Sequence, residues 1–200
     1  MSHKNSKIRV GISCGDPNGI GLEALADALV DERSMSTMVP VVFAPRAIAE
    51  QAFDQRPWGE VEDAKSAKPG QINLVTFDAE DFEHKPGEAS KEAGGVAMES
   101  LQRAVGNLAK TDVDVLVTAP INKDTIRQAG FSFPGHTEYL ASEAGVEEVL
   151  MLLCCGGLRI GMVTGHVDDL GCCGGDQFIP WLHKECEAKC GTTRLERGTF

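Results

Sequence analysis

The sequence lacks the features that mark secreted, membrane-spanning and nucleic-acid-binding proteins. It has no apolar run close to the roughly 20 residues that cross a bilayer. Its start, MSHKNSKIRVGIS, carries positive charge but no apolar signal-peptide region. Basic residues are few, since 19 Lys and Arg stand against 30 Asp and Glu, for a formal net charge of −11. Because nucleic acids and anionic membranes attract clustered Lys and Arg, we expect a cytoplasmic protein with neither partner.

Generic nucleotide, metal and disulfide signatures are also missing. Neither a Walker loop, a G-x-G-x-x-G fingerprint nor an H-E-x-x-H pair occurs. The seven cysteines are an odd number, and in a reducing compartment we expect free thiols rather than a disulfide framework. With 42% hydrophobic and 24% charged residues, the 200-residue chain has the composition of one globular domain or two small ones.

Strand and helix patterns alternate along most of the chain. Strands are predicted at residues 7–13, 39–44, 72–77, 112–119 and 158–164, and helices at 22–30 and 92–108. The polar stretch 54–70 is predicted to be a surface connection, and the apolar stretch 147–155 fits either element. Residues 112–119 are apolar enough to be buried on both faces of a sheet. This order predicts an α/β fold with a largely parallel sheet.

A glycine-rich turn, GDPNGIG, follows the first predicted strand at residues 15–21. Glycine permits positive φ and close backbone approach, and the helix behind the turn would offer unpaired amides to an anion. The same glycines also suit a tight strand-to-helix connection that binds nothing. Both interpretations stay open from these residues alone.

A second polar segment, VTAPINK, ends the predicted strand 112–119. Ligands of parallel sheets bind beyond the carboxyl ends of the strands. Asn122 and Lys123 are therefore placed to hold an anionic or polar substrate, or simply to face water.

A third segment, FPGHTE, sets an imidazole next to a hydroxyl at residues 133–138. His136 and Thr137 could both bind a phosphate, and the histidine could act as an acid or base. Thr137 could also cap a helix that starts at Glu138, because an acidic residue in the first turn stabilises a helix.

His166 comes directly after the predicted strand 158–164. One histidine does not make a catalytic metal site, which needs about three protein ligands, so a structural role is the simpler interpretation. The tail holds atoms suited to zinc, but without paired C-x-x-C knuckles their spacing is irregular. These residues are Cys172, Cys173, His183, Cys186 and Cys190.

In this order and at these spacings, GDPNGIG, VTAPINK, FPGHTEYL and LRIGMVTGH resemble the 4-hydroxythreonine-4-phosphate dehydrogenase family of pyridoxal phosphate biosynthesis. The resemblance covers residues 7 to about 167. It implies the two-domain α/β fold of isocitrate and isopropylmalate dehydrogenases, and a homodimer. It also implies oxidation of 4-phosphooxy-L-threonine with NAD or NADP, followed by decarboxylation to 3-amino-2-oxopropyl phosphate.

The resemblance further implies a divalent metal (zinc, magnesium or cobalt) that polarises the reacting oxygen. Three histidines hold this metal in the family, and His166 matches one of them. His136 and Thr137 match substrate-binding positions. Asp16, Asn122 and Lys123 lie in matching motifs, and we expect them only to line the site. These residues are the candidate site: Asp16, Asn122, Lys123, His136, Thr137 and His166.

The chain departs from the family after His166, where later segments with the other two metal histidines are missing. We expect residues 1–167 to form the N-terminal portion of an incomplete dehydrogenase fold whose C-terminal half is absent. Residues 168–200 are expected to be an atypical Cys- and Gly-containing tail of frameshifted or non-native origin. Three functions stay open: the dehydrogenase above, a dehydrogenase for another phosphorylated hydroxy acid such as threonate or erythronate phosphate, and a non-catalytic ligand-binding remnant.

Overall fold

The structure is a computed structural model, and it describes residues 7–54 and 56–162. The chain divides into two units, the first ending at Leu140 and the second beginning at Ala141. The two are described separately below. The predicted site residue His166 and the predicted tail 168–200 lie outside the described residues.

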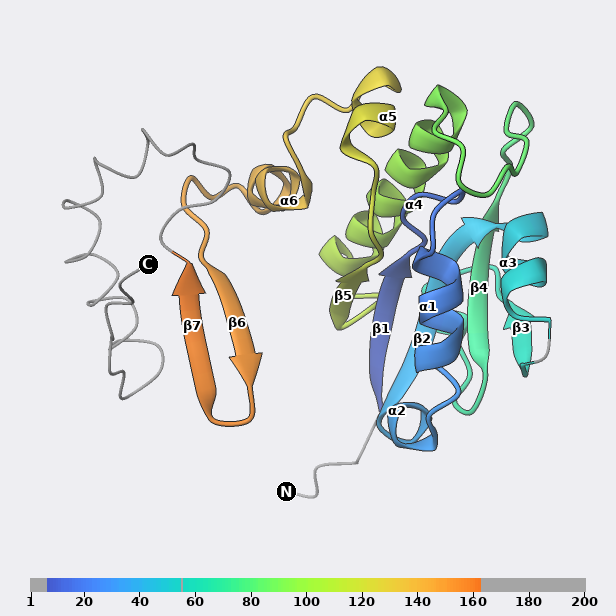
Figure 1. Cartoon of the computed structure of the whole chain (residues 1–200). Helices are drawn as coiled ribbons and strands as arrows, with labels where there is room; N and C mark the ends of the chain where they lie inside the picture. The colour runs from blue at the N-terminus through green and yellow to red at the C-terminus, as the bar shows by residue number, and fades with distance from the viewer. Residues whose placement is uncertain (1–6, 55, 163–200) are drawn as a thin grey trace. The chain divides into compact units, whose positions relative to one another are not determined.

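The first unit is built on a five-stranded sheet in which every neighbouring pair is parallel (Figure 1). The strands are β1 (Ile8–Ser13), β2 (Met38–Pro45), β3 (Trp58–Glu60), β4 (Ile72–Phe77) and β5 (Val115–Thr118). Their order is β3-β4-β2-β1-β5. The predicted α/β fold with a largely parallel sheet is therefore confirmed.

Six helices accompany this sheet in the described part of the chain: α1 (Gly21–Ala28), α2 (Glu32–Thr37), α3 (Arg46–Ala52), α4 (Lys91–Ala109), α5 (Lys123–Gln128) and α6 (His136–Ala144). A short 3-10 helix, η1, spans Ala64–Ser66. The predicted helices 22–30 and 92–108 correspond to α1 and α4. The helix considered at Glu138 corresponds to α6, whereas α2, α3, α5 and the short strand β3 within the predicted connection 54–70 were not predicted.

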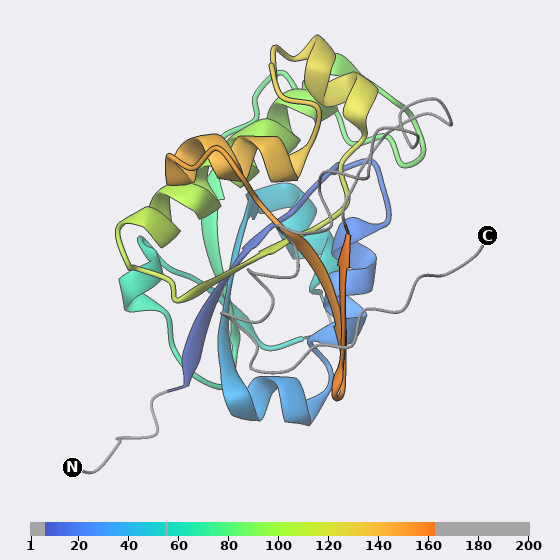
Figure 2. The ribbon, with the colours of Figure 1, turned by 90° about the vertical axis from the view of Figure 1, so that its left-hand side faces the viewer.

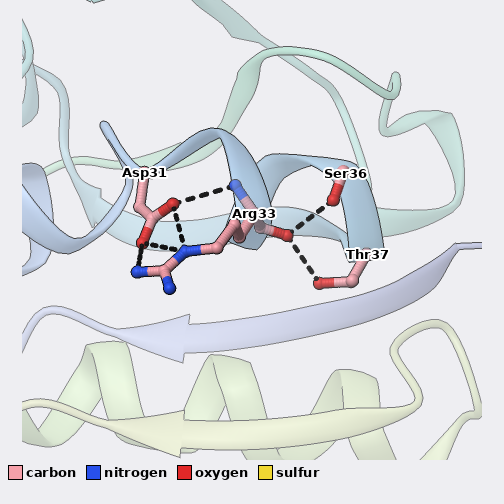
Figure 3. Close-up of polar contacts among 4 residues, drawn as sticks. All are labelled: Asp31, Arg33, Ser36 and Thr37. Carbon is pink, nitrogen blue, oxygen red and sulfur yellow. Dashed lines mark hydrogen bonds and ion pairs between the residues drawn. The ribbon is translucent and has the colours of Figure 1, made fainter.

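The helix α2 shows why a helix can lack an apolar pattern, since none of its residues is buried. Asp31 caps it by accepting the backbone N–H of Arg33 at 2.9 Å, and the Arg33 guanidinium returns to the same carboxylate (Figure 3). Ser36 and Thr37 both donate to the Arg33 carbonyl. The hydrogen bonds from the Arg33 side chain and backbone hold the pKa of Asp31 below its usual value. Local polar contacts, rather than a buried face, therefore define this helix.

Alternate side chains of β2 face two separate apolar clusters. Val42 and Ala44 belong to a cluster with Leu22 of α1 and Ile48 of α3. Val41 and Phe43 belong instead to a cluster with Ala104 of α4. Since neighbouring side chains of a strand point to opposite faces, α1 and α3 cover one face of the sheet and α4 the other. In Figure 2 the green helix α4 lies to the left of the strands and the blue helix α1 to the right.

The expectation that residues 112–119 are buried on both faces is wrong. The strand is limited to β5, which stands at an edge of the described sheet. Val115 and Val117 are 44% and 45% exposed, whereas Leu116 between them packs against the apolar clusters on the α4 side. An apolar composition alone does not distinguish an edge strand from a central one.

The second unit contains an antiparallel hairpin of β6 (Met151–Cys155) and β7 (Leu158–Met162). Gly156 and Gly157 form its two-residue turn, and Gly156 has a φ of 54°. Glycine at a two-residue turn matches the positive φ that such turns require. The predicted strand 158–164 is confirmed over the residues of β7, and the ambiguous stretch 147–155 contains β6.

Within residues 7–54 and 56–162, every helix is too short or too polar to cross a membrane.

Two adjacent glycines of α4 give a matched test of its packing. A Cβ on Gly94 would lie 2.1 Å from the Thr125 carbonyl oxygen of α5, whereas a Cβ on Gly95 would meet nothing within 4 Å. We expect Gly94→Ala to lower the free energy of unfolding by about 1–3 kcal/mol through overpacking. Gly95→Ala should raise it by about 0.5–1 kcal/mol because alanine favours a helix. Urea unfolding of both variants checks this, and equal effects would contradict the close α4–α5 contact.

Candidate functional site

Three of the four sequence motifs meet at the carboxyl ends of β1 and β5. The two strands pair directly, with Ser13 opposite Thr118. The chain leaves β1 toward β2 on one side and returns from β4 to β5 on the other, so the strand order reverses between β1 and β5. In open α/β sheets, this reversal is where ligands bind, because the loops there diverge to opposite faces.

The glycine-rich turn 15–21 packs tightly against the loop that follows β5. The backbone N–H of Asp16 donates to the Pro120 carbonyl at 2.8 Å. Gly15 has a φ of 67°, and a Cβ there would lie 2.3 Å from that same carbonyl oxygen. A Cβ on Gly21 would lie 3.1 Å from the Cβ of Ala119. These glycines serve a contact between two loops, and they leave no cradle open to a pyrophosphate.

Asp16 and Asn18 shape this turn from within. The Asp16 carboxylate accepts the Asn18 backbone N–H at 3.0 Å. The Asp16 backbone carbonyl accepts the Gly19 N–H. Asn18 is only 6% exposed, and its amide bonds to residues 85–88. Asn18 was not predicted as a functional residue. An asparagine in a glycine-rich turn is a weak signal, because it does not say which distant backbone groups it will bond to.

Asn122 and Lys123 begin α5 rather than a water-facing loop. The Asn122 side chain accepts the backbone N–H groups of Asp124 and Thr125 at 3.0 and 3.3 Å, so it is the N-cap of this helix. Asp124 in the first turn favours the same start. Lys123 is exposed, and a Cβ on Gly135 would lie 3.9 Å from its Cε. The lysine therefore stands beside the His-Thr segment.

His136 is the first residue of α6, and Thr137 lies in the first turn. The prediction that Thr137 caps a helix starting at Glu138 is therefore wrong by two residues. The backbone N–H of Tyr139 donates to the Gly135 carbonyl, and this hydrogen bond closes the first turn of α6. Thr137 directly follows His136 in this first turn, and joint binding of one ligand by the two side chains stays a prediction.

The His136 imidazole is held neutral and is not satisfied by the described residues. Its Nε2 is buried and has no hydrogen-bond partner among them. Burial lowers the pKa of His136, and the positive charge of Lys123 lowers it further. A neutral imidazole carries one N–H and one lone pair. A buried polar atom without a partner costs free energy, so this nitrogen suits a ligand oxygen.

An aromatic cluster supports the start of α6. The rings of Phe131, Phe133 and Tyr139 have centroids 5.3–5.5 Å apart. Phe131 and Tyr139 are buried with Ile126 of α5. Because the cluster includes α5 as well as α6, it holds Lys123 and His136 on one supported surface.

Two nucleophile candidates near this edge are buried. Residues 11–15 read GISCG, which matches the pattern G-x-S-x-G of a nucleophile elbow, although no such elbow was predicted. Ser13 is the last residue of β1 and is 1% exposed, so it is not an exposed elbow serine. Cys14 is buried as well, and burial raises the pKa of its thiol to about 11. Ser100 of α4 accepts the Cys14 N–H at 2.8 Å and donates to Phe43 at 2.6 Å, which ties α4 to β1 and β2.

The described residues do not bring together a metal site. Nowhere in residues 7–54 and 56–162 do three His, Cys, Asp or Glu side chains cluster suitably for a metal ion. His166 and the tail residues of the irregular zinc pattern lie outside the described part of the chain.

The electrostatic effect of Lys123 on the pKa of His136 can be measured directly. We expect Lys123→Met to raise the pKa of His136, because a nearby positive charge disfavours the imidazolium. The pKa should stay below its usual value, since burial is the larger cause. A pH titration of the His136 ring signals by NMR gives the result. Arg127→Met on the same helix is the control, because the Arg127 guanidinium pairs with Asp124. An unchanged His136 titration in Lys123→Met would contradict this electrostatic interaction.

The same titration has a consequence for stability. A depressed pKa means that the unfolded chain binds more protons than the folded one between the folded pKa and the usual value near 6.5. The contribution of His136 to stability is therefore complete above pH about 6.5 and is lost as the pH falls through the folded pKa. We expect His136→Gln to flatten this part of the pH dependence of unfolding, which urea unfolding at a series of pH values measures.

Comparison with known proteins gives a consistent set of relatives. The family model described as "Pyridoxal phosphate biosynthetic protein PdxA" matches residues 36–169. A 4-hydroxythreonine-4-phosphate dehydrogenase of Bacteroides thetaiotaomicron is 33% identical over 169 residues, which are 82% of this chain and 46% of the relative. A protein of Clostridium botulinum, provisionally named D-threonate 4-phosphate dehydrogenase, is 29% identical over 82% of this chain and 51% of its own length.

A solved structure agrees with these sequence relatives. The crystal structure of a 4-hydroxythreonine-4-phosphate dehydrogenase from Burkholderia phymatum matches with a TM-score of 0.76 at 28% identity. The match covers 92% of this chain and 58% of that one. The chain thus spans about half the length of the curated relatives it matches.

Proposed function

Because the chain belongs to the PdxA family of pyridoxal phosphate biosynthetic proteins, we propose that it forms part of a dehydrogenase that acts on a phosphorylated hydroxy acid. The substrate proposed first is 4-phosphooxy-L-threonine, whose oxidised product loses CO₂ to give 3-amino-2-oxopropyl phosphate. Relatives named 4-hydroxythreonine-4-phosphate dehydrogenase support this choice. The proposal includes the two-domain fold of isocitrate and isopropylmalate dehydrogenases and a homodimer.

One observation carries the binding part of this proposal. The charge of Lys123 acts on His136, whose buried Nε2 has no partner among the described residues, and Thr137 directly follows this histidine in α6. A cation, an imidazole and a hydroxyl are the groups that a phosphate dianion accepts hydrogen bonds from. The backbone amides of the first turn of α6 add a favourable dipole.

In this proposal the residues of the chain bind and orient the substrate. Lys123 neutralises phosphate charge, Thr137 donates its hydroxyl proton, and His136 donates from a neutral ring. A bound dianion would raise the pKa of His136, so binding is expected to take up protons when the pH is near that pKa. Asp16 and Asn122 hold the surrounding loops through their own hydrogen bonds. These two residues therefore shape the site, since Oδ1 of each already accepts a backbone N–H.

The described residues do not identify a site for either proposed cofactor. A nicotinamide cofactor, NAD or NADP, would accept the hydride, yet the glycines of turn 15–21 are packed against Ala119 and Pro120. A divalent metal would need three ligands, and the part of the chain that the structure describes brings no such set together. No step is therefore assigned to either group, and His166 as a metal ligand stays a prediction.

A related substrate has its own support. The Clostridium botulinum relative carries a name for D-threonate 4-phosphate. That molecule shares the phosphate and the hydroxyl of the first candidate but has no amino group. The described residues proposed to bind substrate contact only phosphate in this scheme, so they serve both substrates equally.

Calorimetry on the 200-residue chain tests the substrate class. We expect 4-phosphooxy-L-threonine and D-threonate 4-phosphate to bind, and L-threonine not to bind. His136→Gln should weaken binding about tenfold or more, because a hydrogen bond to a charged group contributes about 1.5–3 kcal/mol. His84→Gln is the matched control, since His84 bonds to Gln51 of α3 and takes no part in the proposed site. Equal binding of L-threonine would show that phosphate is not recognised.

Turnover distinguishes an enzyme from a ligand-binding remnant. An active dehydrogenase is expected to form reduced nicotinamide with either phosphorylated acid when a divalent metal is present. Phosphate-dependent binding without any reduced nicotinamide would favour the non-catalytic alternative for this chain. The relative rates with the two acids decide between the two substrates.

A further inference from the structure

We propose that Asn18 is a positioning residue for the phosphate-binding group of Lys123, His136 and Thr137, which it reaches through residues 85–88 and the start of α4. This inference rests on the proposed function. It adds a residue that contacts none of the proposed substrate.

The Asn18 side chain connects two segments that lie far apart in the sequence. Its Nδ2 donates to the Glu88 carbonyl at 2.8 Å, and its Oδ1 accepts the Lys85 N–H at 2.9 Å. The Gly87 N–H donates to the Asn18 carbonyl at 2.8 Å. Both side-chain partners are backbone groups, so a residue without this amide would leave the Lys85 N–H and the Glu88 carbonyl without these hydrogen bonds.

The segment held by Asn18 leads directly into α4. Ser90 caps that helix by accepting the Ala93 N–H at 3.1 Å. One turn later, Gly94 brings the backbone of α4 against the Thr125 carbonyl of α5. A shift of residues 85–90 would therefore move the first turn of α4 at the place where it touches α5 without an intervening side chain.

The helix α5 links the position of the first turn of α4 to the candidate site. Lys123 is its first residue, and its charge acts on His136. The turn 15–21 also holds the start of α5 directly. The Asp16 backbone N–H donates to the Pro120 carbonyl, two residues before Asn122, the N-cap of α5. Asn18 thus closes a ring of contacts from turn 15–21 through α4 and α5 and back to the same turn.

A second buried asparagine offers a matched control. Asn73, near the amino end of β4, is fully buried and bonds through Nδ2 to the carbonyls of Pro40, Lys68 and Gln71. Its Oδ1 accepts the Lys68 N–H, just as Asn18 accepts that of Lys85. Asn73 therefore ties a loop at the opposite edge of the sheet. Its loss should destabilise the fold without disturbing the phosphate-binding group.

The experiment compares Asn18→Ala with Asn73→Ala in the full chain by two measurements. The first is the NMR titration of His136, which needs no ligand, and the second is calorimetry with 4-phosphooxy-L-threonine. We expect Asn18→Ala to raise the pKa of His136 toward its usual value and to weaken binding at least tenfold. Asn73→Ala should lower the melting temperature but leave both measurements as in the parent chain.

The outcomes separate this inference from the proposed function. An Asn18→Ala chain that titrates His136 like the parent chain, or an Asn73→Ala chain that shifts it equally, overturns the positioning role. If the parent chain does not bind the phosphorylated probe, the proposed function fails, and the His136 titration still decides the role of Asn18. Should Asn18→Ala not fold, Asn18→Asp replaces it, because a carboxylate still accepts from Lys85 but repels the Glu88 carbonyl. A parent-like titration in that variant would likewise overturn the inference.

Discussion

The arrangement of the candidate site depends on one backbone contact, between residues 15–16 and residues 119–120. Parallel neighbours end at the same edge of a sheet, so the loops after β1 and β5 must share one space. The hydrogen bond from Asp16 to Pro120 needs a distance that no side chain on Gly15 would permit, and it needs the positive φ that glycine adopts readily. With that contact made, Pro120 delivers the chain to the Asn122 cap, and α5 starts where Lys123 reaches the His-Thr segment.

The chemistry of the site follows from burial next to a cation. Water would satisfy Nε2 of an exposed histidine and leave its pKa near the usual value. At His136, burial and Lys123 both disfavour the imidazolium, so the ring is a neutral hydrogen-bonding group beside a fixed positive charge. Such a pair suits an anionic oxygen, because the lysine supplies charge and the ring supplies direction. This geometry therefore supports the proposed binding of a phosphorylated ligand.

Much of the fold could be predicted from local patterns. The strands β1, β2 and β4 combine β-branched residues with turn residues at their ends, and the apolar side of α4 repeats at helical spacing. The helix α2 could not be found this way, because its stability comes from Asp31, Arg33 and their neighbours rather than from an apolar face. The burial of residues 112–119 was predicted wrongly because strand order, not composition, makes β5 an edge of the described sheet.

By itself the sequence determined the α/β class, the three described motifs of the candidate site and the neighbouring His136 and Thr137, because each of these is a property of residues close together in the chain. Only the tertiary structure decided that the glycines of turn 15–21 pack against another loop, that Lys123 stands beside His136, and that Asn18 holds residues 85–88. Those pairings join segments about 13 to 105 residues apart. They depend on the order of the strands and on the side from which each loop returns, and neither follows from local propensity.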